Sequence, residues 1–296
     1  MSKLTIMVGP PSSGKSTYAK KLISFDKYRA DGRDTVYINQ DSQGKEHLKL
    51  FEAAVKEGKD IVVDRLNFSK AQRARYIGPA RTSMYEVEIV VLHENYETCL
   101  KRCLERKDHE TIKDEDSARS ALNMFFSKYE RPTEDECDFL KWIYTEDQKP
   151  PAVICDIDGT LCNVEHRLHH VRGEGKKDWN SFFKEMVNDT PNLWCLELVE
   201  KFSNDYQIVF CSGRPDSWRP QTVEWLAKYG LHPYMYKLYM RPRSDSRNDS
   251  ITKEVLLDFE ILTRFEPFFF VDDRKRVVDV WRRRGYVCLA CHDGDF

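Results

Sequence analysis

The chain has 296 residues, 41% of them hydrophobic and 32% charged, with a formal net charge of −2 at pH 7. This length predicts two domains of about 150 residues each, and the near-neutral charge excludes a global electrostatic attraction to nucleic acid. No apolar run approaches the roughly 20 residues of a membrane span, and no signal peptide is recognisable. We therefore expect a cytoplasmic globular protein without membrane contact.

Short β-type runs alternate with helical patterns over residues 1 to about 130, which predicts a parallel sheet covered by helices on both faces. The expected strands span 4–8, 35–38, 61–63 and 87–92, and the expected helices span 15–25, 45–57, 69–80, 96–106 and 116–129. The acidic, proline-containing stretch 130–151 is interpreted as the domain boundary, with a short helical piece over 137–144.

A second alternating pattern follows. Its expected strands span 152–155, 207–211, 268–271 and 286–290, and its expected helices span 194–202, 218–229, 252–263 and 276–283. Residues 162–192 interrupt this rhythm and are interpreted as an inserted cap. The predicted fold class is α/β, with two doubly wound parallel-sheet domains over 1–148 and 149–296.

Cysteine and basic residues leave alternatives open. The nine cysteines are expected to be free thiols, and the lone CxxC of Cys288 and Cys291 is interpreted as part of a terminal strand. A zinc or redox site there would need further ligands. Basic residues form local clusters, which are either solvated helix faces or grooves beside a site. These clusters are Arg73 with Arg75, Arg241 with Arg243, Arg274 to Arg276, and Arg282 to Arg284.

A P-loop pattern, G-x-x-x-x-G-K-[ST], runs from Gly9 to Ser16 between the first expected strand and helix. Backbone N–H groups of such a loop cradle phosphates, the lysine reaches the β- and γ-phosphates, and the serine hydroxyl holds Mg²⁺. The predicted ATP-binding residues are Gly9, Ser12, Ser13, Gly14, Lys15, Ser16, Thr17, Arg102 and Arg106.

Further residues would separate a kinase from a simple nucleotide hydrolase. Asp41, after the second strand, is placed to accept the proton of an acceptor hydroxyl, although it could instead cap the following helix. Asp64 ends the next strand and could hold Mg²⁺ or organise the acceptor site with Asn67. Arg102 and Arg106 lie one helical turn apart, which suits either a lid over the phosphate or surface ion pairs.

The second half carries Asp156-Ile157-Asp158-Gly159-Thr160 at the end of an apolar run. In such a pattern the first carboxylate attacks phosphorus and the second acts as acid and base, with Mg²⁺ offsetting the charge. Asp272 and Asp273 end another apolar run and are further metal candidates, beside Asp156 and Asp158. Ser212, Gly213 and Arg214 also follow a strand and would bind phosphate oxygens, and Lys253 would neutralise the phosphoaspartate.

These motifs carry a resemblance. The first half is similar to P-loop polynucleotide kinases, and the second half is similar to haloacid dehalogenase phosphatases. Their order and the closing run from Asp272 to Phe296 resemble the phage-type polynucleotide 5′-kinase/3′-phosphatase family. The resemblance covers nearly the whole chain and implies a P-loop polynucleotide kinase domain followed by a phosphatase domain.

The resemblance implies transfer of the ATP γ-phosphate to 5′-hydroxyl ends of RNA or DNA, and hydrolysis of 3′-phosphate or 2′,3′-cyclic phosphate ends for a later ligase. It also implies a homotetramer and a phage-infected bacterial host. Residues matching the family's catalytic positions are Lys15, Asp41, Arg106, Asp156, Asp158, Ser212, Arg214, Arg241 and Lys253. At Gly44 the chain departs from the family arginine that contacts the acceptor strand, and Arg65 is the suggested replacement, beside Asp64 and Asn67.

Two other functions compete with end healing. A fusion acting on nucleosides, nucleotides or other small metabolites would have closed pockets where a polynucleotide enzyme has open basic grooves. A scaffold with one inactive domain is disfavoured because no core motif residue is missing from either half.

Overall fold

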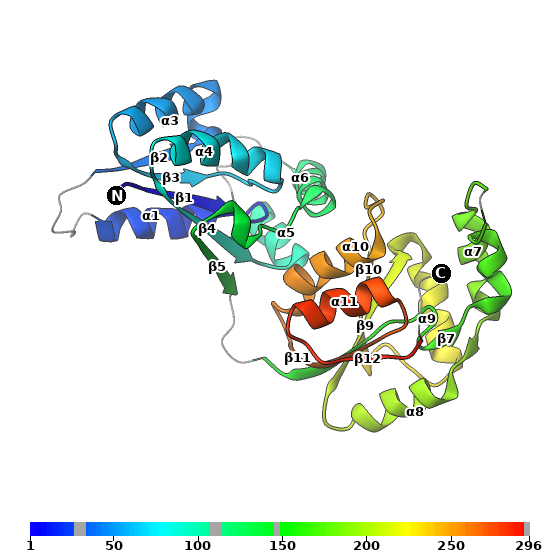
Figure 1. The fold of residues 1–296 in the computed structure, drawn as a ribbon. Helices are drawn as coiled ribbons and strands as arrows, with labels where there is room; N and C mark the ends of the chain where they lie inside the picture. The colour runs from blue at the N-terminus through cyan, green and yellow to red at the C-terminus, as the bar shows by residue number, and fades with distance from the viewer. Residues whose placement is uncertain (27–33, 107–113, 145–148, 174, 293–296) are drawn as a thin grey trace. The chain divides into compact units, whose positions relative to one another are not determined.

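The computed structural model describes residues 1–26, 34–106, 114–144, 149–173 and 175–292. The chain divides into two compact units, Met1–Thr145 and Glu146–Phe296, each with its own five-stranded sheet (Figure 1). The pairs within both sheets are parallel, which confirms the predicted α/β class. The predicted domain boundary at 148/149 falls at the edge of residues 145–148, which lie outside the described part of the chain. The predicted closing residues Gly294, Asp295 and Phe296 lie outside it as well.

The first unit has the strand order β2-β3-β1-β4-β5. Its strands are β1 (Lys3–Val8), β2 (Thr35–Asn39), β3 (Asp60–Asp64), β4 (Glu86–His93) and β5 (Phe139–Tyr144). Its helices are α1 (Lys15–Asp26), α2 (Gln40–Gln43), η1 (Gly44–Glu46), α3 (His47–Lys56), α4 (Lys70–Thr82), α5 (Tyr96–Glu105), α6 (Glu115–Lys128) and η2 (Glu134–Glu136). Helices α3 and α4 lie on one face of the sheet and α1 on the other (Figure 1), so the central strands β1 and β3 are apolar and buried.

The prediction of a helical piece over 137–144 is wrong. Residues Phe139–Tyr144 form β5, which pairs in parallel with β4 at the edge of the sheet. Trp142 and Tyr144 point to one face of the strand, where both rings stack on His93 of β4 at centroid distances of 5.4 and 4.5 Å. An edge strand that is only partly buried has no continuous apolar run, and its pairing with β4 joins segments that are distant in the sequence.

A buried ion pair holds α4 to the segment that leads into β5. Arg73 donates from Nε and Nη2 to the Glu136 carboxylate at 2.8 and 2.9 Å, and Nη1 donates to the carbonyls of Asn67 and Glu130. The side chains of Arg73 and Glu136 are 0% and 3% exposed. The two arginines of this predicted basic cluster therefore differ in role, because Arg73 is buried in a structural ion pair and Arg75 is exposed to solvent.

We expect Arg73→Ala to destabilise the first unit by about 3–5 kcal/mol, because it leaves the Glu136 carboxylate buried without its partner. Arg75→Ala, two residues away on the same helix and exposed, should change stability by less than about 0.5 kcal/mol. Urea unfolding of both variants measures the difference, and equal midpoints would contradict the structural role of Arg73.

The second unit has the strand order β10-β9-β6-β11-β12. Its strands are β6 (Pro151–Cys155), β9 (Gln207–Pro215), β10 (Tyr236–Arg241), β11 (Glu266–Asp272) and β12 (Cys288–Ala290). Its helices are α8 (Leu193–Phe202), η5 (Asp216–Trp218), α9 (Arg219–Lys228), α10 (Asp249–Leu256), the π-type turn η6 (Leu257–Ile261) and α11 (Lys275–Arg283). The sequence pattern did not predict β10, which is a half-buried strand at the edge of the sheet. Helices α10 and α11 cover one face and α8 the other (Figure 1).

The inserted segment between β6 and α8 has its own small structure. It contains β7 (Cys162–Asn163), η3 (Glu165–His170), α7 (Trp179–Lys184), η4 (Glu185–Asn188) and β8 (Thr190–Pro191), with β7 and β8 paired antiparallel. We refer to residues 162–192 as the cap. Leu168, Phe182 and Phe183 of the cap pack into the same apolar core as β6 and β9, so the cap is anchored to its unit.

All nine cysteines are free, as the sequence predicted. Cys288 lies in β12 and Cys291 immediately follows it, where its thiol contacts the Thr160 hydroxyl. Within the described part of the chain, no helix is long and apolar enough to cross a membrane.

Candidate phosphate-transfer sites

Each unit gathers its polar motif residues at the carboxyl ends of its strands. In the first unit these are the ends of β1, β2 and β3, and in the second unit the ends of β6, β9, β10 and β11. Parallel strands end at the same edge of a sheet, and ligands of open α/β folds bind there. Each unit therefore presents its own candidate site.

The P-loop of the first unit follows β1 and leads into α1. Gly9 approaches β4 so closely that a Cβ atom would lie 2.8 Å from the Leu92 carbonyl oxygen, and Gly14 has a left-handed φ of +95°. Only glycine accommodates both requirements. The loop ends in the N-terminus of a 12-residue helix, whose dipole and free N–H groups favour an anion.

A pocket of about 600 Å³ opens over this loop. It is lined by most of the predicted ATP-binding residues, namely Ser12, Ser13, Gly14, Lys15, Ser16, Thr17, Arg102 and Arg106, and also by Tyr18, Lys21, Leu92 and Glu105. Lys15 is buried in the loop and donates to the Pro10 carbonyl. Burial lowers the pKa of Lys15, and the carboxylates of Asp64 and Asp41 oppose that shift.

The two predicted lid arginines differ in their contacts. Arg102 of α5 forms an ion pair with the buried Glu94 at 2.8 Å. Arg106 follows the last turn of α5 and is exposed at the pocket. Both arginines line the pocket, and Arg102 would have to exchange its partner Glu94 to contact a phosphate there.

Carboxylates lie at the ends of β2 and β3. Asp64 is buried and accepts hydrogen bonds from the Tyr37 hydroxyl at 2.5 Å and from the Asn39 amide at 3.1 Å. Burial and the neighbouring Asp64 raise the pKa of Tyr37 to about 12, so Tyr37 remains a donor. Asn39, rather than Asp41, caps α2. The exposed Asp41 carboxylate is therefore not needed by the helix and is available for chemistry.

The structure does not support Asn67 as a direct acceptor contact. Its side chain is 1% exposed and donates to the Met7 carbonyl at 2.9 Å, which fixes the end of β1. The residue also has a positive φ of 45°, a conformation that asparagine tolerates better than most residues. Arg65 is partly exposed and donates to the Tyr76 hydroxyl at 2.8 Å.

The second unit concentrates acids around Asp156. Asp156, Asp272 and Asp273 are all buried, and one oxygen atom from each lies within 4.8 Å of the others. Burial raises the pKa of Asp156. The neighbouring carboxylates of Asp272, Asp273 and Asp158 raise this pKa further, and the ammonium of Lys253 opposes the shift. The same causes, burial and then Asp272, raise the pKa of Asp273 to about 6. The Asp273 Oδ2 atom has no hydrogen-bond partner in the described part of the chain.

Lys253 provides the positive charge of this group. Its ammonium contacts Asp156 at 3.0 Å and Asp272 at 2.8 Å, and it is almost completely buried. Burial alone would lower its pKa, but the carboxylates of Asp156 and Asp272 outweigh that effect and raise it. Three buried carboxylates against one ammonium leave negative charge uncompensated, which suits a divalent cation.

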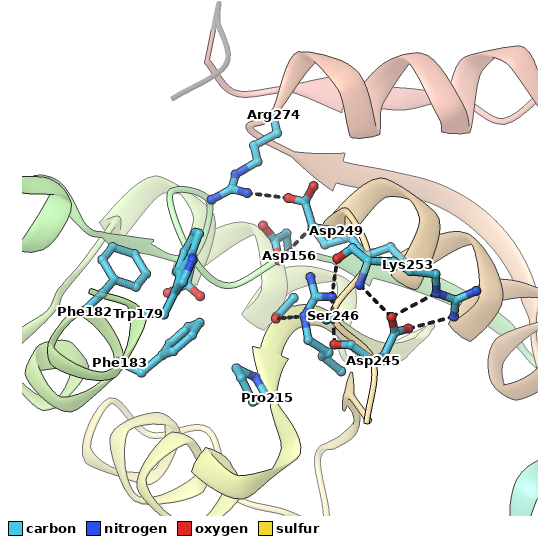
Figure 2. Close-up of a pocket in the computed structure, with 14 residues that line it drawn as sticks. Asp156, Trp179, Phe182, Phe183, Pro215, Asp245, Ser246, Asp249, Lys253 and Arg274 are labelled. Atoms are coloured by element: carbon cyan, nitrogen blue, oxygen red, sulfur yellow. Dashed lines mark hydrogen bonds and ion pairs between the residues drawn. The ribbon is translucent and has the colours of Figure 1, made fainter. Parts of the chain in front are cut away.

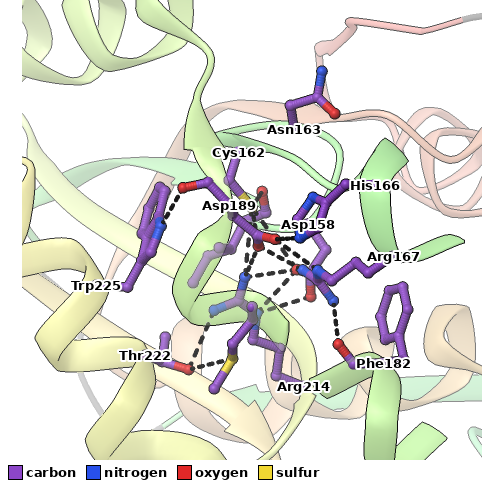
Figure 3. A network of polar contacts seen from close by, with 12 residues as sticks. Asp158, Cys162, Asn163, His166, Arg167, Phe182, Asp189, Arg214, Thr222 and Trp225 are labelled. Carbon is purple, nitrogen blue, oxygen red and sulfur yellow. Dashed lines mark hydrogen bonds and ion pairs between the residues drawn. The ribbon is translucent and has the colours of Figure 1, made fainter. Parts of the chain in front are cut away.

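Asp158 lies apart from the three clustered acids. Arg214 donates to both of its oxygen atoms at 2.7–3.0 Å, and Arg167 of the cap donates to Oδ1 at 2.5 Å (Figure 3). Burial alone would raise the pKa of Asp158, but the two guanidinium groups outweigh it and hold that pKa well below its usual range. The sequence predicted Asp158 as a further metal ligand beside Asp156, but its side chain lies outside the cluster of Asp156, Asp272 and Asp273.

The predicted phosphate-binding residues Ser212 and Arg214 lie beneath the surface of the site. Both are 0% exposed; the Ser212 hydroxyl accepts the Arg214 backbone N–H, and the Arg214 guanidinium contacts Asp158 and Asp189. Arg214 therefore positions Asp158, and its role as a phosphate contact stays a prediction. Arg241 lines the pocket, and it holds the surrounding loops by donating to the Gly213 and Arg247 carbonyls and the Thr252 hydroxyl.

Sequence reasoning missed three residues of this site. Arg167 and Asp189, both in the cap, form a two-point ion pair at 2.6 and 2.7 Å (Figure 3), and the Asp189 carbonyl accepts from Trp225. Asp249 at the start of α10 pairs with Arg274 at 2.5 Å and lines the pocket (Figure 2). The only sequence signal for Arg167 was its place in a His- and Lys-rich insertion.

We expect Arg167→Ala to lower the free energy of unfolding of the second unit by about 3–5 kcal/mol, because Asp189 would remain buried and unpaired. Arg172→Ala removes the exposed cap ion pair with Glu165 and should cost less than about 1 kcal/mol. Thermal unfolding of the two variants compares them directly. A similar melting temperature for both would show that the Arg167 network contributes little.

Comparisons with known proteins assign both halves. Residues 150–296 match the family model of the polynucleotide kinase PNKP phosphatase domain, and residues 4–132 match the AAA domain family. Each half of the chain is therefore similar to one family, the second half to the phosphatase domain of polynucleotide kinases and the first half to the AAA domain.

Individual proteins are similar to all or part of this chain. A protein of Autographa californica nuclear polyhedrosis virus, described as a bifunctional polynucleotide kinase/RNA ligase, is 27% identical, over 95% of this chain and 41% of its own length. The Arabidopsis thaliana transcription factor bHLH140 is 30% identical over 45% of this chain and 15% of its own length. The chain thus spans less than half of either relative. A chain of the Pnkp1/Rnl/Hen1 RNA repair complex is 26% identical, with a TM-score of 0.43 over 100% of this chain and 97% of that one.

Proposed function

We propose that this protein heals nucleic-acid ends. Its first unit would transfer the ATP γ-phosphate to a 5′-hydroxyl of RNA or DNA, and its second unit would hydrolyse 3′-phosphate or 2′,3′-cyclic phosphate ends. The observation that carries the proposal is that each unit holds, at the carboxyl edge of its own sheet, a separate set of groups for one of the two opposite phosphate reactions. The viral relative, described as a polynucleotide kinase/RNA ligase, supports polynucleotide ends as the substrate.

For the kinase reaction, the P-loop N–H groups and Lys15 would hold the β- and γ-phosphates, and Ser16 with Asp64 would hold Mg²⁺. Asp41 would accept the proton of the attacking 5′-hydroxyl, because its carboxylate is exposed and not used as a helix cap. Arg106 and Arg102 would stabilise the charge that develops on the transferred phosphoryl group. Arg65, partly exposed after β3, is the candidate acceptor contact in place of Gly44.

For the phosphatase reaction, the Asp156 carboxylate would attack phosphorus while the bond to the 3′-oxygen breaks. The departing oxygen would take a proton from Asp158, and Asp158 would then take a proton from the water that hydrolyses the phosphoaspartate. Arg167 and Arg214 keep Asp158 ionised before substrate binds, so the proton that Asp158 passes to the 3′-oxygen would first reach it from the monoanionic phosphate of the substrate or from solvent. The negative charge of a bound phosphate raises the proton affinity of this carboxylate, which favours the acid role only when substrate is present.

The acid cluster fits Mg²⁺. Asp156, Asp272 and Asp273 would hold the cation. The Asp273 Oδ2 atom, which accepts no hydrogen bond from the residues that the structure describes, is an oxygen that a hard cation prefers. When bound, the cation would offset the repulsion between Asp156 and the incoming phosphate. Lys253 fixes the position of Asp156 and Asp272 from the other side.

Further elements of the proposal follow from the resemblance and the viral relative. A polynucleotide ligase would consume the healed ends, and the relative's described kinase/ligase combination supports that coupling. We also propose that the protein acts in the cytoplasm of an infected cell and assembles into a homo-oligomer. The resemblance suggests a tetramer.

One short RNA with a 5′-hydroxyl and a 3′-phosphate tests the proposal. Incubated with the protein, Mg²⁺ and γ-labelled ATP, it should gain label at the 5′ end and lose its 3′-phosphate, as seen on a denaturing gel. The matching DNA oligonucleotide tests the choice of polymer. If neither polymer changes while free nucleosides or nucleotides do, the protein acts on small metabolites instead.

A further inference from the structure

The phosphatase pocket has two chemically different walls. It has a volume of about 350 Å³. One wall carries the acids and Lys253, and the other carries Trp179, Phe182 and Phe183 of the cap (Figure 2). The phosphatase chemistry proposed above uses the first wall only. The aromatic wall is unexplained by phosphate binding, because a phosphate group makes no apolar contact.

The aromatic wall is a supported ring with one open side. Trp179 is 43% exposed, whereas Phe182 and Phe183 are 2% and 8% exposed. Phe182 meets Trp179 edge-on at a centroid distance of 5.7 Å, and Phe183 lies nearly parallel to it at 6.0 Å. Phe182 is itself fixed by the Arg167 guanidinium, 4.1 Å above its ring. The orientation of Trp179 is therefore set by packing before any ligand arrives.

The spacing indicates how a ligand would bind. A planar ring between two others needs about 7 Å, twice the contact distance of carbon atoms. The 6.0 Å between Trp179 and Phe183 is too narrow, so a flat group would stack on the exposed side of Trp179. The exposed Lys177 has its ammonium over the Trp179 ring, 5.7 Å from the centroid, and a base that stacks on that face would displace this flexible side chain. Positive charge beside an aromatic platform is the combination that binds backbone and bases of single-stranded nucleic acid.

We propose that Trp179 is a nucleobase subsite of the phosphatase, which stacks the base of the 3′-terminal nucleotide while its phosphate lies at Asp156. The inference rests on the proposed polynucleotide phosphatase activity and deepens it. A pocket of about 350 Å³ can hold one nucleotide, and we infer that the terminal nucleotide occupies it without its pairing partner. The subsite reads the presence of a base and not its identity, because every base offers a stacking face.

The test compares two RNA oligonucleotides with a 3′-phosphate, one with a normal terminal nucleotide and one whose terminal residue lacks its base. Wild-type protein should hydrolyse the complete substrate with a kcat/KM about 10-fold to 100-fold higher, the range expected for stacking one base. Trp179→Ala should lose this advantage, mainly through KM, and should act on the abasic substrate like the wild type. Trp179→Phe should retain most of the advantage.

Tyr234→Ala is the matched control, because Tyr234 is an aromatic residue of the same unit that is 83% exposed and outside the pocket. It should leave both substrates unaffected. Equal wild-type rates on the two substrates, or an equal loss on both in Trp179→Ala, would overturn the subsite. The wild-type comparison decides the question even if a Trp179 variant fails to fold. If wild-type protein cleaves p-nitrophenyl phosphate but neither oligonucleotide, the polynucleotide phosphatase activity itself is wrong.

Discussion

Asp156→Asn should reduce 3′-phosphatase activity by at least about 10⁴-fold and leave the 5′-kinase unchanged. The amide has nearly the shape of the carboxylate but cannot attack phosphorus, and removing a nucleophile costs rate factors of this order or more. Asp156 is buried against Lys253, so the substitution also tests whether that pair is needed for folding. The measurement is hydrolysis of a 3′-phosphorylated RNA beside 5′-phosphate transfer in the same preparation.

Asp205→Asn supplies the control for this experiment. Asp205 is an exposed aspartate of the same unit that precedes β9, and its replacement should leave both activities at wild-type level. Residual phosphatase activity above one hundredth of wild type in Asp156→Asn would assign the nucleophile elsewhere. Loss of both activities together, with the protein still folded, would contradict two independent sites.

Lys15→Ala should give the opposite result, with kinase activity reduced by about 10³-fold or more and phosphatase activity retained. The lysine ammonium is the buried positive charge of the P-loop, and the phosphoryl-transfer transition state depends on such charge stabilisation. The cost should appear mainly in kcat. Label transfer from ATP to a 5′-hydroxyl RNA measures it under saturating ATP.

Lys20→Ala is the matched variant for Lys15. Lys20 lies in the same helix α1 and is exposed, so its loss should change kinase activity less than about threefold. If Lys15→Ala retained near wild-type transfer, the pocket over the P-loop would not be the nucleotide site. A parallel loss of phosphatase activity would instead indicate general misfolding.

Motifs that depend on local chain geometry could be predicted from the sequence. The P-loop needs glycines at fixed spacing and a following helix, and the pair Asp156 and Asp158 needs only the end of a strand. Each of these two motifs lies within a few consecutive residues, so residue spacing alone indicates its chemistry. The alternation of apolar runs with helical patterns likewise predicted the two parallel sheets.

Contacts between distant segments could not be predicted in the same way. Phe139–Tyr144 forms a strand by pairing with the distant strand β4, and the role of Arg214 depends on Asp158, 56 residues away. Arg167 and Asp189 of the cap, separated by 22 residues, carry no motif of their own. Sequence spacing places residues on one strand or helix but does not show which buried charges pair.

The sequence by itself determined the fold class, the two phosphate motifs and the order of the two domains, because periodicity and short motifs encode local backbone geometry. The tertiary structure alone decided that Asp158 is held by two arginines, that Asn67 fixes a strand end, and that Trp179 faces the acids across one pocket. The physical reason is that the charge state and partners of a buried group depend on everything packed around it. Those neighbours are brought together only by folding.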